Sequence, residues 1–113
     1  MKQITAIFRP HRLEAVEAKL HELQHLPGFT IFPARGHPRG HGHDHHFADD
    51  EWNPDSHQQT VLIAFCNDAD AAGIVDAITK AAHTGHSGDG IVGVSELTDV
   101  VRIRTGERAD AAL

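Results

Sequence analysis

The 113-residue sequence has little cysteine, little basic charge and no long apolar run, and each shortage excludes some classes of function. Its one cysteine, Cys66, rules out a disulfide within the chain and fits a reducing compartment. We expect Cys66 to be a small buried side chain near the end of a strand. No segment approaches the roughly 20 apolar residues of a membrane helix, and the first residues lack the pattern of a secretory leader. These absences predict a soluble cytoplasmic protein with no direct membrane insertion.

Basic side chains are outnumbered by acidic ones. The chain has 10 Lys and Arg residues against 16 Asp and Glu, a net charge of −6 with histidine neutral. Non-specific binding to nucleic acid needs a basic face, so this class of partner is excluded. Histidine, in contrast, is abundant, with 11 residues. Because histidines titrate near pH ~6.5, the net charge should become much more positive below about that pH.

Alternating apolar and polar residues predict the strands. The alternation from Lys2 to Arg9 is typical of a strand. Further strands are expected over Phe29–Ala34, Thr60–Phe65 and Ile91–Val94, and a short extended piece over Val100–Arg104.

Two segments have the apolar spacing of amphipathic helices. The first runs from Leu13 to Leu23 and is ended by a Pro-Gly pair. The second follows Asp68 or Asp70, either of which can cap it, and Gly85 suits its left-handed exit. The expected buried stripe of the second helix is Ile74, Val75, Ile78, Ala81 and Ala82.

The order of these elements predicts one domain over residues 1–113. It is an α+β fold, a ferredoxin-like split βαβ (βαββαβ) sandwich with an antiparallel sheet and two helices on one face. A chain of this length buries only a modest core, so oligomerisation would help it. The polar, alanine-rich tail of residues 105–113 is expected to be loose.

One long loop interrupts these regular patterns. Residues 36–57 read GHPRGHGHDHHFADDEWNPDSH, with no helical or strand period. Such a loop in a small domain is usually functional or disordered. Its six histidines, with nearby carboxylates, suit a borderline metal such as Zn or Cu. These candidate ligands are His37, His41, His43, His45, His46 and His57. The alternative is a solvated loop in which histidine is merely polar.

The same loop contains two aromatic residues, Phe47 and the only tryptophan, Trp52. Aromatic side chains on a loop are candidate hot spots for a partner protein. The alternative for Trp52 is packing of the loop against its own domain.

A second constellation indicates phosphate binding. Residues 84–90 read TGHSGDG, and three glycines in so short a turn let backbone N–H groups converge on an anion. Farther along, Arg102 and Arg104 alternate, so an extended segment would place both guanidinium groups on one face. Two parallel arginines suit a polyphosphate. Together the turn and the arginines predict a phosphate site.

These motifs carry a resemblance to a known family. The TGHSGDGIVGV turn, the RIRTGE motif and the opening KQITAIFRPHRLEAVEAKL resemble the PII signal-transduction family over nearly the whole chain. The resemblance implies a homotrimer that binds adenine nucleotide (ADP, AMP or ATP) between subunits. It also implies that residues 36–57 form the loop, called the T-loop in that family, that contacts a regulated target protein.

The resemblance also assigns residues. It puts Arg102 and Arg104 on phosphate, Thr30 near the adenine, Phe65 in the adenine pocket, and Gly36 and Arg39 at the base of the loop. The Gly-rich turn that holds the nucleotide corresponds to Thr84, Gly88, Asp89 and Gly90.

The departures from the family are informative. Where members that sense 2-oxoglutarate have a glutamine and a lysine, this chain has Gly40 and Gln59. A lysine that contacts the outer phosphates is replaced by Ile91, and the absence of tyrosine excludes uridylylation. We therefore expect ADP or AMP to bind at least as well as ATP, without the usual 2-oxoglutarate response.

The sequence leaves several functions open. The leading hypothesis is a non-enzymatic regulator whose nucleotide controls the loop. His-rich loops resemble a divergent group linked to heavy-metal efflux, whose target would be a membrane transporter. A second divergent group is associated with carboxysomes and responds to adenine nucleotide and bicarbonate. A metal buffer is a further alternative, and an enzyme has the least support because no nucleophile and base are paired.

Overall fold

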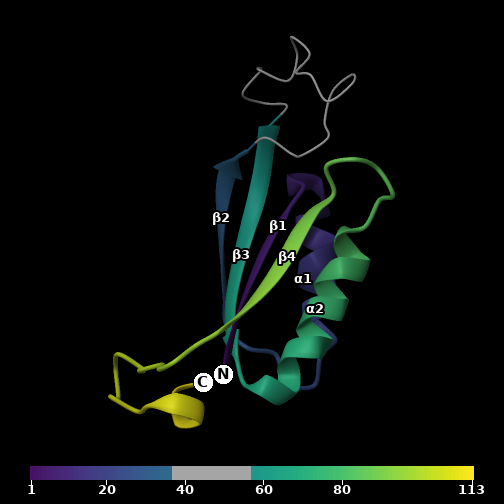
Figure 1. Ribbon diagram of the computed structural model, residues 1–113. Coiled ribbons are helices and arrows are strands. Elements are labelled where there is room, and N and C mark those ends of the chain that lie inside the picture. The colour runs from purple at the N-terminus through teal and green to yellow at the C-terminus, as the bar shows by residue number, and fades with distance from the viewer. Residues whose placement is uncertain (37–56) are drawn as a thin grey trace.

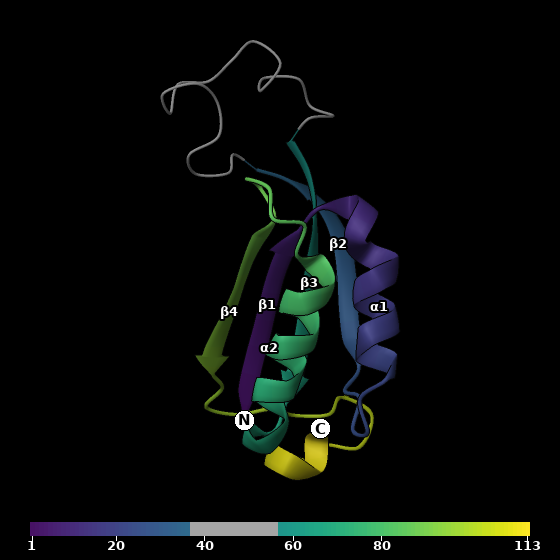
Figure 2. The ribbon, with the colours of Figure 1, turned by 90° about the vertical axis from the view of Figure 1, so that its right-hand side faces the viewer.

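A computed structural model of the protein describes residues 1–36 and 57–113 (Figure 1). Its strands are β1 (Lys2–Phe8), β2 (Phe29–Arg35), β3 (Gln58–Cys66) and β4 (Gly90–Glu96). Its helices are α1 (Leu13–His21) and α2 (Asp68–Ala82), with short 3-10 turns at Pro10–Arg12 and Ala109–Ala112. The sheet is antiparallel, in the order β2-β3-β1-β4. Both helices lie on one face of it (Figures 1 and 2), which confirms the predicted α+β ferredoxin-like fold.

Strand β1 is central and pairs on both sides. Ile4, Ala6 and Phe8 are buried under the helices, and their partners Leu62 and Ala64 on β3 face the same way. The helices close this core, and their largest buried side chains are Val16, Leu20, Ile74 and Ile78. The side chains of β1 therefore alternate as predicted: every second one is buried in the core, and the others lie on the opposite face of the sheet.

That opposite face of the sheet bears no helix among the described residues. Phe32, Val61, Ile7 and Ile91 are neighbours across β2, β3, β1 and β4, and they form an apolar row, here called the open-face row. Phe32 is 42% exposed and Ile91 is 69% exposed. Exposed apolar side chains aligned in this way are typical of protein–protein contact surfaces.

The ends of α2 differ slightly from the prediction. Asn67 caps the helix, because its extended backbone lets its side chain accept a hydrogen bond from the Asp70 N–H at 2.9 Å. The expectation that Asp68 or Asp70 is the cap was wrong, since both lie in the first turn. Val75 is half-buried rather than buried. Gly85 has the expected positive φ, 87°. Within the ranges 1–36 and 57–113 no helix has the length and apolar character needed to span a membrane.

Cys66 ends β3 and is buried, as predicted. Burial is the largest effect on its thiol and raises its pKa above the usual value. A thiol that is buried and protonated is a weak nucleophile, which fits a packing role.

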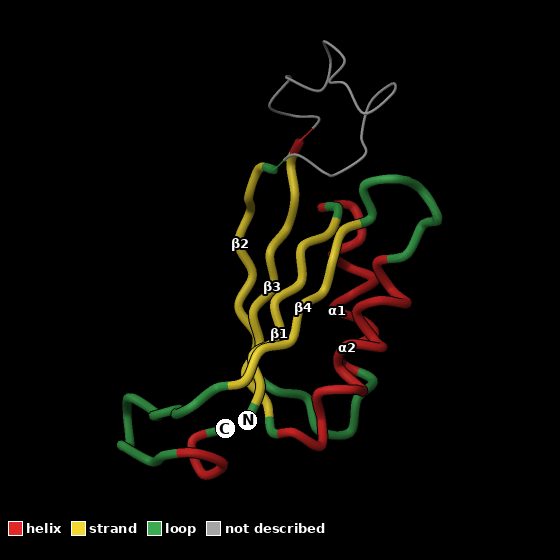
Figure 3. Tube along the Cα trace, in the orientation of Figure 1, coloured by secondary structure: helices red, strands yellow, loops and turns green. Residues whose placement is uncertain are grey.

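The C-terminal part of the chain differs most from expectation. Residues 100–113, here called the C-terminal lobe, form a tight hairpin followed by the 3-10 turn (Figure 3). Val101 makes only an isolated bridge with Arg108, so the expected extended piece at Val100–Arg104 was wrong. The chain reverses there because Gly106, at φ 73°, returns its N–H to the Arg102 carbonyl at 2.7 Å.

The tail of the lobe is ordered rather than loose. Ala112 in its 3-10 turn is buried, with 2% of its surface exposed. The composition of the tail alone does not reveal this burial.

Gly90 is required by the pairing of β4 with β1. It pairs with Phe8 and has a φ of 114°. A Cβ on Gly90 would lie 1.8 Å from the carbonyl oxygen of Ile7, a contact that neither backbone can relieve without moving. The glycine therefore permits the close approach of these two strands.

Substitution of Gly90 tests this constraint. Gly90→Ala is expected to lower the free energy of unfolding by about 2–4 kcal/mol, because it combines a strained backbone with a clash. Gly73→Ala is the matched control: it fills open space in α2 and should raise stability by about 0.5–1 kcal/mol. Urea unfolding at one protein concentration measures both, and equal stability of the two variants would contradict the constraint.

Candidate functional site

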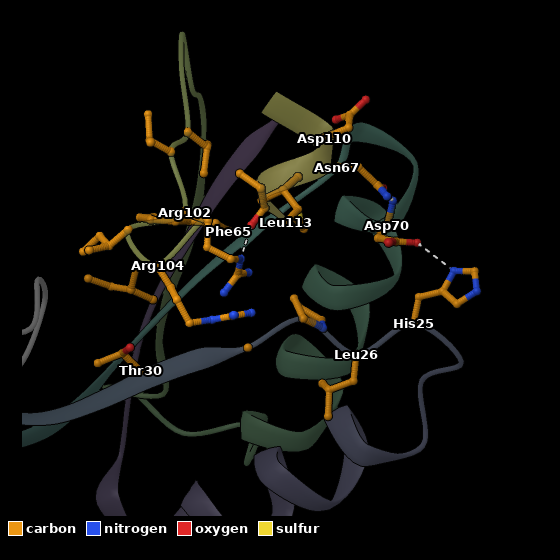
Figure 4. A pocket seen from close by; sticks show the side chains of 18 residues that line it. His25, Leu26, Thr30, Phe65, Asn67, Asp70, Arg102, Arg104, Asp110 and Leu113 are labelled. Carbon is orange, nitrogen blue, oxygen red and sulfur yellow. Dashed lines mark hydrogen bonds and ion pairs between the residues drawn. The ribbon is translucent and has the colours of Figure 1, made fainter. Parts of the chain in front are cut away.

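A cleft of about 880 Å³ lies between β2, β3, the start of α2 and the C-terminal lobe (Figure 4). Thr30, Phe65, Arg102 and Arg104, all predicted site residues, line it together. Figure 4 shows both guanidinium groups reaching into the same space. Phe65 is 45% exposed and offers an aromatic face. A cleft with two arginines beside an exposed ring can hold an anionic group joined to an aromatic base.

Arg102 is held in place by the lobe. Its Nε donates a hydrogen bond of 2.8 Å to the carbonyl oxygen of Ala112. The far end of the cleft has polar residues that the sequence did not indicate. There, His25 Nδ1 lies 3.8 Å from Asp70 Oδ1 (Figure 4).

The Gly-rich turn after α2 forms a second cluster. Asp89 organises it by accepting hydrogen bonds from the N–H of Thr84 at 2.8 Å, the N–H of Gly85 at 2.9 Å and the hydroxyl of Thr84. The bond from the Thr84 hydroxyl, followed by those from the backbone, lowers the pKa of Asp89 from 3.8 to about 2. The carboxylate is thus engaged within the turn, so Asp89 shapes the turn rather than contacting an anion.

Arg9 is a residue of this cluster that sequence reasoning missed. Its guanidinium donates to the Ser87 carbonyl, and its Nε lies 3.7 Å from Asp89 Oδ1. Gly88, at φ 90°, leaves room for it, because a Cβ there would lie 2.7 Å from Arg9 Nη2. The only sequence signal was a basic residue at the end of β1, and its meaning depends on the pairing of β1 with β4.

The two clusters lie at opposite ends of the sheet. Gly90 pairs with Phe8 at one end of β1, whereas Leu97 N donates to Met1 O at the other, at 3.0 Å. The seven residues of β1 separate these ends by about 20 Å. Within one chain, therefore, the turn and the two arginines cannot contact the same phosphate group.

The base of the long loop lies at the end with the turn. Gly36 follows β2, and its N–H donates to the His57 carbonyl at 3.1 Å. Arg35 pairs with Gln58, and Thr60 pairs with Phe8, the partner of Gly90. Gly36, Gly88, Asp89 and Gly90 thus lie at the same end of the sheet, while Thr30 and Phe65 lie toward the other end.

Most of the loop predictions fall outside the described residues. This applies to Arg39, Phe47, Trp52 and the histidines from His37 to His46. His57 is described and buried. Residues 1–36 and 57–113 contain no group of three or more His, Cys, Asp or Glu side chains that could hold a metal ion. The metal site stays a prediction.

The fold, the Gly-rich turn and the arginine cleft can now be set beside known proteins. The family model described as Nitrogen regulatory protein P-II matches residues 1–107. This chain belongs to the P-II family. Membership supports a regulatory signalling protein rather than an enzyme, as the sequence predicted.

Individual P-II proteins match along the whole chain. The nitrogen regulatory protein P-II of Azospirillum brasilense is 36% identical over 113 residues, 100% of each chain. That of Mesorhizobium japonicum is 39% identical over 107 residues, 95% of each chain. Nitrogen regulatory protein GlnK of Escherichia coli K12 is 34% identical over 113 residues, again 100% of each chain.

The lowered pKa of Asp89 predicts a pH-dependent contribution to stability. A carboxylate whose pKa falls from 3.8 to about 2 on folding stabilises the folded state above pH 3.8, and this contribution is lost as the pH falls towards 2. The difference in melting temperature between the wild type and Asp89→Asn should therefore be largest above pH 3.8 and shrink below it. Thermal unfolding at a series of pH values measures this difference.

Asp76→Asn is the control for this comparison. Asp76 forms an exposed i,i+4 pair with Lys80 at 3.0 Å on α2, and such a pair contributes little to stability. A difference between wild type and Asp89→Asn that does not change with pH would show that the carboxylate charge does not hold the turn.

Proposed function

We propose that this P-II protein binds an adenine nucleotide between two copies of the chain and regulates a target protein through the loop of residues 36–57. The observation that carries the proposal is the separation of the two phosphate-binding clusters. Each is held by its own hydrogen bonds, yet they lie at opposite ends of β1. A second copy can bring its arginine cleft to the turn of the first, and the ligand then touches both.

The open-face row supports this assembly. Its exposed Phe32 and Ile91 flank Val61 and Ile7 on a face that the helices leave uncovered. Burial of this face against other copies would stabilise a homotrimer, the state that the family resemblance implies. Threefold symmetry would give three equal clefts, each with the turn of one copy and the arginines of the next.

Each cluster has a distinct role in the proposed cleft. Phe65 and Thr30 contact the base, while Arg102 and Arg104 bind phosphate oxygens as charged donors. The turn contributes backbone N–H groups from Gly88 and Gly90. The bond from the Thr84 N–H to Asp89, and that from Arg9 to the Ser87 carbonyl, keep the turn in place.

The nucleotide controls the loop because both meet at the same end of the sheet. The pairing of β2, β3, β1 and β4 places Gly36 at the loop base and Gly90 at the same end of the sheet. A ligand seated on the turn, with Arg39 as a further contact, then favours one arrangement of the loop. The target protein, a membrane transporter among the candidates, recognises that arrangement through the loop histidines, Phe47 and Trp52. Such coupling requires the nucleotide to bind that arrangement more tightly.

Ile91 determines which nucleotide is preferred. It follows Gly90 directly, is 69% exposed, and replaces the lysine that contacts the outer phosphates in the family resemblance. One charge-assisted hydrogen bond contributes roughly 1.5–3 kcal/mol. Without it, this protein holds ADP or AMP at least as well as ATP.

Restoring the lysine tests the proposed function. In isothermal titration calorimetry the wild type should bind ADP and AMP at least as tightly as ATP, and Ile91→Lys should raise the affinity for ATP relative to ADP by about tenfold or more. Ala18→Lys adds the same charge at an exposed position of α1, away from the turn and the cleft, and should leave the ratio unchanged.

The wild-type titration can also refute the proposal. Absence of binding to every adenine nucleotide would overturn it. A tenfold preference for Mg-ATP over ADP, with cooperative binding of 2-oxoglutarate, would overturn the assignment of specificity to Ile91.

A further inference from the structure

The C-terminal lobe is closed by its own hydrogen bonds. Arg102 N donates to Glu107 O at 2.9 Å, and Ala109 N donates to Val100 O at 2.9 Å. An ion pair between Arg108 and Asp99 ties the end of the hairpin to the segment before it. Ala109 then turns the chain with a φ of 56°, a value that non-glycine residues rarely adopt. This turn carries the 3-10 helix back toward the cleft.

The returning segment ends on the side chain of Arg102. The Ala112 carbonyl oxygen accepts a hydrogen bond from Arg102 Nε at 2.8 Å, and Ala112 itself is buried. The two terminal nitrogens of Arg102 make no hydrogen bond with the described residues. Because Nε is engaged, the planar guanidinium is fixed with its free edge toward the cleft (Figure 4).

We propose that the C-terminal lobe is a positioning device for the nucleotide site, in which the Ala112 carbonyl holds Arg102 ready to bind phosphate. This inference rests on the proposed function, and it assigns residues 105–113 a role beyond lining the cleft. A free arginine loses much of its rotational freedom when it binds a ligand, and this lowers the affinity. An arginine held before the ligand arrives avoids that loss.

Lysine could not take this place. A guanidinium can donate to a carbonyl through Nε and to a phosphate through its terminal nitrogens at once, because its donors lie in a rigid plane. A lysine has one nitrogen at the end of a flexible chain, which cannot hold the same two-sided geometry. The bond from Arg102 Nε to the Ala112 carbonyl, here called the clasp, therefore explains an arginine at position 102 more specifically than its charge does.

A pair of variants at Ala109 opens the clasp or leaves it closed. Ala109→Pro removes the N–H that binds Val100 O and cannot adopt a positive φ, so it should release the 3-10 turn from Arg102. Ala109→Gly keeps the N–H and accepts the positive φ, so it is the matched control. Calorimetry should show ADP bound roughly twofold to tenfold more weakly by Ala109→Pro, the range expected for ordering one long side chain. Binding of adenosine, which lacks phosphate, should be unchanged.

Variants of Arg102 separate positioning from a structural role. In an Arg102→Ala background, Ala109→Pro should cause no further loss of ADP affinity. In an Arg102→Lys background, Ala109→Pro should likewise cause no further loss. An equal loss with and without Arg102, or an equal loss for ADP and adenosine, would overturn the inference. These outcomes would mean that the lobe acts as a wall of the cleft.

The clasp can also be observed without nucleotide. In the free protein, the Arg102 Nε–H signal in NMR spectra should be protected from exchange with water, and Ala109→Pro should abolish the protection. An unprotected signal in the wild type would contradict the clasp. A protected signal in a protein that binds no adenine nucleotide would contradict the proposed function and the role of Arg102 in phosphate binding. Failure of the clasp can therefore be told apart from failure of the proposed function.

Discussion

The pairing of β1 with both β3 and β4 is the constraint on which the rest of the structure depends. It buries Ile4, Ala6 and Phe8 under the helices and leaves Ile7 in the open-face row. It also brings Gly90 against the Ile7 carbonyl, where only glycine fits. One register thus fixes the core, the uncovered face and the end of the Gly-rich turn, and a shift by one residue would exchange the two faces of the strand.

The same register divides the candidate site. The turn and the loop base are set at the Phe8 end of β1, and the C-terminal lobe with its arginines at the Met1 end. Each half is stabilised locally, by Asp89 and Arg9 in one case and by the Ala112 carbonyl in the other. This local stabilisation lets each half keep its shape before a ligand or a second copy arrives. A site divided in this way links binding of the ligand to contact between copies.

The sequence predicted what depends on local patterns and missed what depends on partners distant in the chain. Alternation and helical spacing were enough for all four strands and both helices, because burial follows the period of the element. The same alternation misled at Val100–Arg104, since a strand also needs a neighbour and Val101 has only Arg108. Arg9 was missed because its contact with Ser87 exists only after β1 and β4 pair. The alternation predicted the pair Arg102 and Arg104, and the family resemblance predicted Thr30 and Phe65. The division of the candidate site between two ends of the sheet follows from the register.

The central claim is that one nucleotide is held by the turn of one copy and the arginines of another. Complementation between two binding-deficient variants tests it most directly: His86→Glu places a negative charge on the turn, and Arg104→Glu reverses one of the arginines. When the two are co-expressed and assemble at random, roughly a quarter of the clefts should have both halves unmodified. Calorimetry with ADP should then show about that fraction of sites with wild-type affinity, although each variant alone binds poorly. No recovery in mixed assemblies would contradict the claim.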